Sequence, residues 1–421
     1  MSALTNSAGQ LWLPYTQMQT VPPPLPVAST DGAHIVLADG RRLVDGVSSW
    51  WTACHGYNHP HIRAAVQDQL AVMPHVMFGG LVHEPARRLA DRLAALLPGD
   101  LNRVFFSDSG SVSVEIAMKM ALQYFINRGE TGRRRFIAFE GAYHGDTIGA
   151  MSVCDPEEGM HSLFTGLLPE QHVIPLPRTD SEFAAFDSFL ADHAGECAGV
   201  IMEPLVQGAG GMKFHTPEVL AAIHTRAQDK GLLFILDEIM TGFGRTGSMF
   251  ACEQAGVIPD IMTLSKALTG GTMALAATVA SEKVFEAFLS DDPGAALMHG
   301  PTYMANPLAC AAANASLDLF ETEPRLAQVA AIGSHFDTAL EPCRGLPGVV
   351  DVRVKGAIGV VQLEDLKAND WLKARFVEEG VWIRPFGDIV YLMPPFVVSE
   401  PELAQLTGAV VKVVREWSRQ R

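Results

Sequence analysis

The strongest constraint on the fold is an alternation of short apolar segments and amphipathic helical segments between about residues 60 and 300. The clearest apolar segments are residues 104–106, 136–139, 200–202, 232–236 and 261–264. Each ends in polar or glycine-rich residues, and stretches with a helical apolar stripe, such as residues 114–124, lie between them. Strands that are apolar along their whole length are typical of parallel sheets covered by helices on both faces. The alternation therefore predicts a doubly wound α/β domain.

The two ends of the chain have a different pattern, which predicts a second, smaller α+β domain. Beyond residue 307, helical stretches are followed by strand-like segments at residues 349–354, 358–362, 381–384 and 389–393. Strand-like residues 34–37 and 42–44 flank an Asp-Gly turn near the N-terminus and are expected to join this domain. We expect residues 1–59 to form an N-terminal arm and part of the smaller domain. Residues 60–306 would form the large domain, and residues 307–421 the remainder of the smaller one.

Composition excludes several classes of function. The 421 residues are 48% hydrophobic, and 47 acidic residues against 31 Lys and Arg give a net charge of −16. This charge disfavours nucleic acid and anionic membranes as partners. No segment approaches the ~18 apolar residues of a membrane span, and residues 1–17 lack the features of a signal peptide. The six cysteines form no C-x-x-C pair, which favours reduced thiols and a cytoplasmic location.

Ligands of parallel sheets bind beyond the carboxyl ends of the strands, and two predicted strands end in loops suited to a flat phosphorylated molecule. Residues 107–111, Ser-Asp-Ser-Gly-Ser, precede a helix whose first N–H groups could bind a phosphate. An ordinary N-cap turn has the same composition. Tyr143, in the loop of residues 141–146, could lie over a flat ligand or pack within a simple loop.

Two other predicted strands end in charged residues. Asp237 follows a fully apolar segment, where a buried carboxylate needs a cation such as a protonated ring nitrogen on a ligand. A helix-capping role is the alternative. Lys266 follows residues 261–264, and burial there would lower the pKa of its amine toward that of a nucleophile. A surface lysine is the alternative for Lys266.

Two further sequence patterns suggest ligand sites, but the residues around them disfavour both sites. Residues 242–247 match G-x-G-x-x-G, but acidic residues precede the glycines and no amphipathic helix follows, so a dinucleotide-dependent oxidoreductase is disfavoured. His55 and His59 suggest a metal site, but Gly56 and Pro60 prevent the helix that would align them. We therefore predict no metal site.

A longer motif joins these features. Residues 237–247, Asp-Glu-Ile-Met-Thr-Gly-Phe-Gly-Arg-Thr-Gly, followed by Ser-Lys-Ala-Leu at 265–268, resemble the class III aminotransferases of the fold-type-I group. The resemblance extends in order over most of the chain. It implies a large, mainly parallel-sheet α/β domain with a smaller α+β domain, pyridoxal 5′-phosphate as cofactor, and a homodimer with shared active sites.

The resemblance also implies roles for individual residues. Lys266 would bond to the cofactor and then shuttle the proton of the reaction, and Asp237 would keep the pyridine nitrogen protonated. Tyr143 would stack on the ring, with Ile239 against its opposite face. The phosphate would be held by Gly110 and Ser111, together with Pro301 and Thr302 of the partner subunit.

Residues 12–16, 48–51, 75–80, 299–302 and 381–387 are similar to one branch of the class. This branch uses S-adenosylmethionine to aminate 8-amino-7-oxononanoate in biotin biosynthesis. The resemblance implies a substrate pocket lined by Tyr15, Trp50, Trp51 and Gly300, with Arg384 binding the carboxylate of the keto acid.

Several alternatives stay open at this stage. Lysine could replace S-adenosylmethionine as the donor, and the chain could be an ω-amino acid or amine:pyruvate transaminase, or an aminomutase. A non-catalytic binding protein is disfavoured because Lys266 and Asp237 are both present. The sequence departs from the expected pattern near the cofactor motif at Met240 and Ser265. Further departures lie at Leu13, Tyr303 and Ala305.

Overall fold

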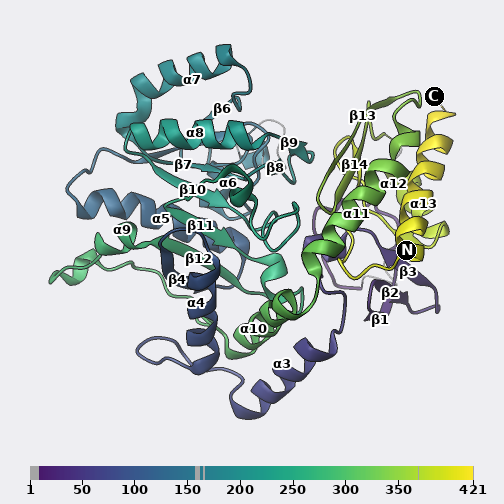
Figure 1. The fold of residues 1–421 in the computed structure, drawn as a ribbon, viewed down its shortest axis with the longest axis horizontal. Helices are drawn as coiled ribbons and strands as arrows, with labels where there is room; N and C mark the ends of the chain where they lie inside the picture. The colour runs from purple at the N-terminus through teal and green to yellow at the C-terminus, as the bar shows by residue number, and fades with distance from the viewer. Residues whose placement is uncertain (1–8, 157–161, 165, 368, 421) are drawn as a thin grey trace.

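The computed structural model describes residues 9–156, 162–164, 166–367 and 369–420. Residues 1–8, which belong to the segment considered above as a signal peptide, lie outside the described residues. The centre of the molecule is a seven-stranded sheet in the order β4-β12-β11-β10-β7-β5-β6 (Figure 1). Its strands are β4 (Leu101–Ser107), β5 (Arg135–Phe139), β6 (His172–Ile174), β7 (Cys197–Met202), β10 (Leu233–Asp237), β11 (Ile261–Leu264) and β12 (Ala276–Ser281). All five apolar segments singled out in the sequence form strands of this sheet, and the fold-type-I α/β prediction is confirmed.

One strand runs against the others. β12 pairs antiparallel with both β11 and β4, whereas β10 pairs parallel with β11 and β7. Its sequence, Ala-Ala-Thr-Val-Ala-Ser, lacks the large apolar side chains that marked the other strands. This strand and the three-residue β6 were therefore missed in the sequence.

Helices cover both faces of the sheet, as continuous apolar strands require. Alternate residues of β10 show the two faces: Leu233 and Ile235 pack in the core cluster of α5 (Gly110–Asn127). Phe234 and Leu236 pack in the cluster of α8 (Pro217–Asp229). All four side chains are fully buried or nearly so. The carboxyl ends of the parallel strands are thereby fixed between two packed layers.

The two chain ends lie together. β1 (Val27–Asp31), β2 (His34–Leu37) and β3 (Arg42–Asp45) form a sheet that β15 (Val381–Trp382) completes by pairing parallel with β3. A second sheet contains β13 (Val349–Lys355), β14 (Ile358–Leu363) and β16 (Ile389–Leu392). The predicted strand at 381–384 is thus only two residues long, which leaves residues 383 and 384 outside the regular sheet.

The remaining elements connect and cover these sheets. The helices are α2 (Ser48–Trp51), α3 (Pro60–Val72), α4 (Glu84–Leu96), α6 (Ile148–Ser152), α7 (Asp180–His193), α9 (Glu282–Glu286), α10 (Pro307–Thr322), α11 (Arg325–Ala339), α12 (Asn369–Glu378) and α13 (Glu400–Ser418). A short hairpin joins β8 (Val206–Gln207) to β9 (Lys213–Phe214), and 3-10 turns lie at residues 162–164, 194–196, 251–255, 266–269, 293–295 and 341–343.

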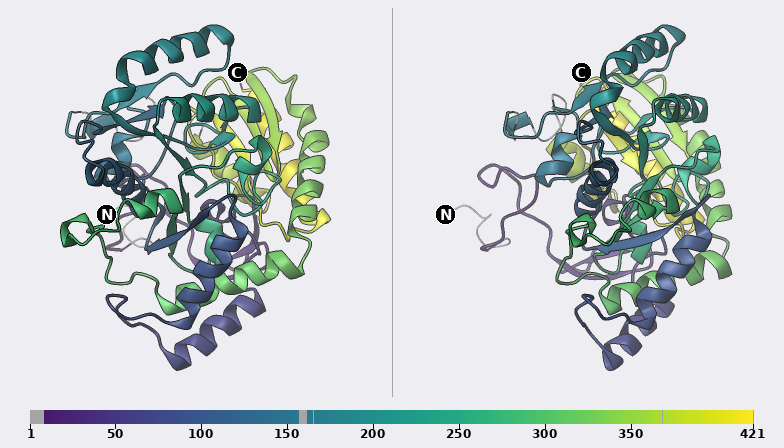
Figure 2. Two further views of the ribbon diagram at one scale, coloured as in Figure 1. Left: turned by 60° about the vertical axis from the view of Figure 1, so that its left-hand side comes forward. Right: turned by 90° about the vertical axis from the view of Figure 1, so that its left-hand side faces the viewer.

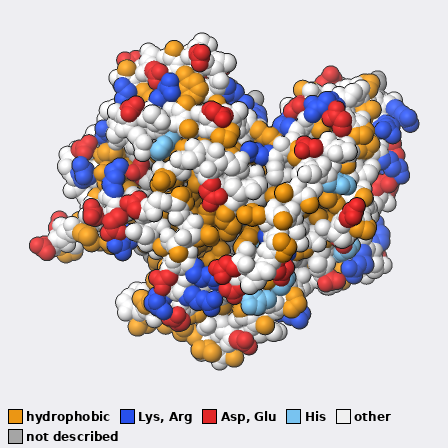
Figure 3. Space-filling view, viewed as in Figure 1, with side chains coloured by type: hydrophobic (Ala, Val, Ile, Leu, Met, Phe, Trp, Pro, Cys, Tyr) orange, Lys and Arg blue, Asp and Glu red, His pale blue; other side chains and the backbone are white. Residues whose placement is uncertain are grey.

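The division into two domains remains a proposal, and the packing of α10 bears on its position. Ala312, Ala315 and Leu319 of α10 pack against Ile62 of α3. α10 also contacts α4, which packs on β4 of the large sheet. We therefore propose that the C-terminal part of the smaller domain begins after α10 rather than at residue 307. In Figure 3 a notch at the upper edge separates the two parts.

None of the helices in the described ranges is long and apolar enough to cross a membrane.

Candidate active site

Lys266 lies just beyond β11, at the wall of a cavity at the carboxyl edge of the large sheet. Its backbone has a φ of 48°, in the left-handed region that a lysine rarely adopts. The Nζ atom lies 4.4 Å from the centre of a Trp51 ring, and within the described part of the chain it has no hydrogen bond or ion pair. Burial lowers the pKa of the amine to about 8, although Asp237 and Glu203 act in the opposite direction. A minor fraction of this amine is therefore neutral near physiological pH, but a much larger one than for an exposed lysine.

Asp237 ends the neighbouring strand and is held by three donors. Its Oδ1 accepts hydrogen bonds from the backbone N–H of Ile239 (3.1 Å) and the hydroxyl of Thr263 (3.2 Å). Its Oδ2 accepts one from Nδ1 of His144 at 2.7 Å. Asp237 is only 4% exposed, so the carboxylate is fixed and faces the cavity as a preorganised negative group.

A second buried carboxylate, Glu203, was not singled out in the sequence. It follows β7 directly and accepts hydrogen bonds from the backbone N–H groups of Tyr143 (3.1 Å) and Gly208 (2.8 Å). Burial raises its pKa to about 7. The strand-end rule that pointed to Asp237 and Lys266 would also have found Glu203.

Gly110 and Ser111 begin α5, whose N-cap is Ser109. Ser109 Oγ accepts the N–H of Val112 at 3.3 Å, whereas the N–H groups of Gly110 and Ser111 have no hydrogen-bond partner among the described residues. The space around them is tight. A Cβ on Gly110 would lie 3.0 Å from Ile239, and one on Gly145 only 2.2 Å from the Ser111 hydroxyl. Glycine at both positions allows this close packing of the loop and Ile239 against the helix end, whose N–H groups could bind a phosphate.

Tyr143 and Ile239 both line the cavity. The hydroxyl of Tyr143 donates to Asp146 Oδ1 at 2.9 Å, and the hydroxyl of Tyr15 donates to the other oxygen of the same carboxylate. Burial raises the pKa of both phenols, so both remain protonated donors. Asp146 thereby ties the N-terminal segment to the loop that carries Tyr143.

The double tryptophan occupies a strained turn. Ser48, Ser49, Trp50 and Trp51 all have φ between 47° and 75°, a conformation that costs an L-residue about 1–2 kcal/mol each. The buried Asp45 holds the turn by accepting hydrogen bonds from the N–H groups of residues 47 and 49, at 2.8 and 2.9 Å. Sequence reasoning missed this aspartate, which has no motif of its own.

The two tryptophans have different surroundings. Trp51 is buried, and its indole N–H donates to the hydroxyl of Tyr391 at 3.3 Å. Trp50 is 39% exposed and packs edge-on against Tyr15. The guanidinium of Arg384 lies 4.7 Å from the centre of the Trp50 ring. Arg384 has no carboxylate partner in the described part of the chain, so its charge is available to a ligand.

Three predicted site residues lie neither in the lining of this cavity nor in the aromatic cluster beside it. Gly300, Pro301 and Thr302 do not line it in their own chain, and Gly300 and Thr302 are exposed. The other predicted residues either line the cavity or, like Tyr15, Trp50 and Arg384, lie in the cluster beside it.

The glycine-rich segment of residues 242–247 and His55, which were disfavoured as ligand sites, make packing contacts in the structure. Arg245 of the glycine-rich segment is buried and donates to the carbonyl of Pro394 at 2.9 Å. His55 accepts from Nε of Arg325 at 2.9 Å and bonds to Ser316 at 3.0 Å. Both side chains therefore use their polar atoms in packing between segments distant in sequence.

Comparison with known proteins identifies the family. The family described as aminotransferase class-III matches residues 15–414. The chain belongs to the class III aminotransferases. A relative from Mycobacterium leprae, named adenosylmethionine-8-amino-7-oxononanoate aminotransferase, is 47% identical over 96% of this chain and 95% of its own. A relative of the same name from Corynebacterium glutamicum is 46% identical over 92% and 93%.

Solved structures agree with this assignment. The adenosylmethionine-8-amino-7-oxononanoate aminotransferase of Methanocaldococcus jannaschii superposes with a TM-score of 0.92 at 33% identity, covering 97% of each chain. An (S)-enantioselective omega-transaminase from Thermomicrobium roseum gives 0.89 at 29% identity, covering 98% of this chain and 97% of its own. The protein is thus a pyridoxal-phosphate-dependent aminotransferase.

The residues present fit this cofactor. The cavity offers a buried amine for its aldehyde, a fixed carboxylate for its ring nitrogen and a glycine cradle for its phosphate, at Lys266, Asp237 and Gly110. Each group has the charge or N–H donors that the matching part of the cofactor requires.

The pKa of Lys266 gives a testable pH dependence. Only the neutral amine is a nucleophile, so the cofactor-free protein should take up pyridoxal phosphate faster as pH rises, with a midpoint near 8. Glu203→Gln removes a carboxylate that raises this pKa, and the midpoint should move down. Stopped-flow fluorescence would measure both rates, with exposed Glu140→Gln as the control. A midpoint close to 10 in the unmodified protein would contradict the analysis.

Proposed function

We propose that this protein transfers the amino group of S-adenosylmethionine to 8-amino-7-oxononanoate, giving 7,8-diaminononanoate for biotin biosynthesis. The observation that carries the proposal is the cluster of Tyr15, Trp50 and Arg384, in which Arg384 has no carboxylate partner among the described residues. The neighbouring Trp51 lies over the buried amine of Lys266. An apolar chain with one terminal carboxylate matches such a cluster. Relatives 40–47% identical over almost the whole chain have names that state this activity.

In the proposed mechanism, Lys266 carries the proton and Asp237 holds the charge on the cofactor ring. When bound, pyridoxal phosphate supplies an electron sink for the carbon that carries the amino group. In its neutral form, which the lowered pKa makes accessible near pH 8, the Lys266 amine would take the proton from that carbon and return it to a carbon of the cofactor. Asp237, fixed by its three donors, would hold the proton on the ring nitrogen.

Other residues would orient the cofactor and exclude water. Tyr143 and Ile239 lie in the cavity wall, where they would cover the two faces of the ring. The N–H groups of Gly110 and Ser111 would bind the phosphate. Trp51, which lies over the lysine amine, would shield the reacting atoms from solvent.

Arg384 and the aromatic cluster would select the acceptor. The guanidinium lies over Trp50 and is near Tyr15, so its position is fixed by packing rather than by a carboxylate. A substrate carboxylate could then form a bidentate pair without displacing an internal partner. The apolar chain would lie along the indole surface toward Lys266.

We further propose a cytoplasmic homodimer in which each subunit completes the site of the other. Gly300 and Thr302 are exposed and lie outside their own cavity, so they are available to a second subunit together with Pro301. Figure 2 shows the N-terminal segment standing out from the body in its right-hand view. Trp12 in this segment is 88% exposed, and a partner would cover it.

A product assay tests the proposed reaction. The purified protein, loaded with pyridoxal phosphate, is given 8-amino-7-oxononanoate with S-adenosylmethionine, lysine or a simple amine, and 7,8-diaminononanoate is measured by mass spectrometry. We expect product with S-adenosylmethionine and none from the Lys266→Ala variant. Product with lysine alone would reassign the donor. Turnover of simple amines with no use of the keto acid would favour the omega-transaminase activity of structural relatives.

Arg384→Ala should raise KM for the keto acid by about 10–100-fold, because one charge-assisted hydrogen-bonded pair contributes about 1.5–3 kcal/mol. KM for the donor should change much less. Arg384→Lys should recover part of the loss. Arg87→Ala serves as the control, because Arg87 is an exposed arginine on α4 that is already paired with Glu84 and Asp91. Equal effects on both substrates would refute the carboxylate assignment.

A further inference from the structure

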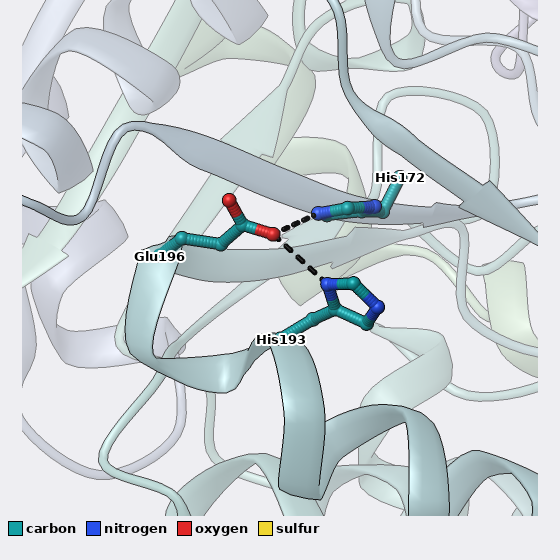
Figure 4. A group of neighbouring side chains, drawn as sticks. All are labelled: His172, His193 and Glu196. Atoms are coloured by element: carbon teal, nitrogen blue, oxygen red, sulfur yellow. Dashed lines mark hydrogen bonds and ion pairs between the residues drawn. The ribbon is translucent and has the colours of Figure 1, made fainter.

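A cluster of three possible metal ligands lies at the edge of the large sheet, apart from the cofactor cavity. His172 begins the edge strand β6, His193 ends α7, and Glu196 lies in the 3-10 turn that follows. Figure 4 shows both imidazole rings directed at the same carboxylate. Nε2 of His172 and Nδ1 of His193 each lie 2.9 Å from Oε1 of Glu196.

The donor atoms are already close to the arrangement that a metal ion requires. The three ligand atoms lie within 4.8 Å of one another, the one such group of three in the described part of the chain. A tetrahedral ion with bonds of about 2.0–2.1 Å holds its ligand atoms about 3.3 Å apart. Small side-chain rotations would therefore open space for an ion between the two nitrogens and the oxygen.

The neighbouring Arg135 favours an orientation of the Glu196 carboxylate in which Oε1 faces the two histidines. Nε of Arg135 lies 3.7 Å from Oε2 of Glu196, which leaves Oε1 for the histidines. Arg135 is itself neutralised in part by Glu170 at 2.8 Å.

Access and rigidity are also suitable. The side chains of His193 and Glu196 are 41% and 42% exposed, so an ion can enter from solvent. His172 is 14% exposed and is fixed by the pairing of β6 with β5. Stacking of His193 on Phe189, with ring centres 4.7 Å apart, holds the second ring in place.

We propose that His172, His193 and Glu196 form a zinc site. Two imidazole nitrogens and one carboxylate are ligands that zinc prefers over magnesium or calcium, and water would complete the tetrahedron. On binding, the proton on the ring nitrogen that faces Oε1 would move to the other nitrogen of the same ring. This tautomer exchange frees Nε2 of His172 and Nδ1 of His193 for the ion and needs no net proton loss.

The site has a structural consequence for the sheet edge. β6 pairs only with β5 in the described sheet, and β5 leads into the loop that carries Tyr143. A metal ion bound there would join the start of β6 to the end of α7 and the following turn. Zinc should therefore raise the unfolding temperature, since it binds the folded protein but not the separated ligands.

No local sequence pattern points to this cluster. The expectation of no metal site rested on His55 and His59, whereas His172, His193 and Glu196 lie on three different elements. Only the fold brings the three ligands together.

The test is zinc binding to the cofactor-loaded protein, measured by competition with a chromophoric chelator. We expect one zinc ion per chain with a Kd in the micromolar range or tighter. His193→Ala should weaken binding at least tenfold, and Glu196→Gln, which keeps the side-chain size, should also weaken it. His61→Ala is the matched control, because His61 is 49% exposed and is paired with a single carboxylate, Asp318.

Aminotransferase activity without zinc should be unchanged in these variants and shows that they are folded. Zinc should raise the unfolding temperature of the unmodified protein and of His61→Ala, but not that of His193→Ala. Failure to bind zinc in the micromolar range would overturn the proposal. Equal zinc affinity in the unmodified and His193→Ala proteins would overturn it as well.

Discussion

The site depends on one electrostatic arrangement: the buried amine of Lys266 lies in a cavity with two buried carboxylates, Asp237 and Glu203. Desolvation alone would leave any of these charges unfavourable. In the sheet, the amine and the carboxylates lie close enough to offset one another. Glu203 follows β7, Asp237 ends β10 and Lys266 follows β11, and these three strands are neighbours. Backbone N–H groups and His144 satisfy the carboxylates, and the amine keeps a pKa near 8. The parallel topology thus places acid, base and cofactor cavity at one edge.

The second constraint is a set of strained backbone conformations that contacts with distant parts of the chain stabilise. Lys266 and the turn from Ser48 to Trp51 have left-handed backbone conformations that these residues avoid when free. Asp45 hydrogen-bonds the turn from inside the smaller sheet, and the hydroxyl of Ser48 donates to the carbonyl of Met393 at 2.7 Å. The positions of the two tryptophans therefore depend on contacts from both the N-terminal and the C-terminal parts of the chain. This explains why the pocket lies where the two parts meet.

The sequence predicted much of this arrangement, for identifiable reasons. Apolar runs marked the strands β10 and β11, and the charged residues after them marked the site. β12 was missed because alanine and threonine carry little hydrophobic signal, and its antiparallel direction follows from pairing that no local pattern encodes. Glu203 and Asp45 act through backbone hydrogen bonds, which depend on loop geometry. The roles of residues 300–302 rest on the resemblance, because they lie outside the cavity of their own chain.

The most direct test of the account is the visible absorption spectrum of the cofactor-loaded protein after S-adenosylmethionine alone is added. We expect the band of the bound cofactor to decrease and to return when 8-amino-7-oxononanoate follows, because the keto acid would remove the amino group and Lys266 could then hold the cofactor again. A band that S-adenosylmethionine leaves unchanged, in a protein that still binds pyridoxal phosphate, would contradict the assigned donor half-reaction.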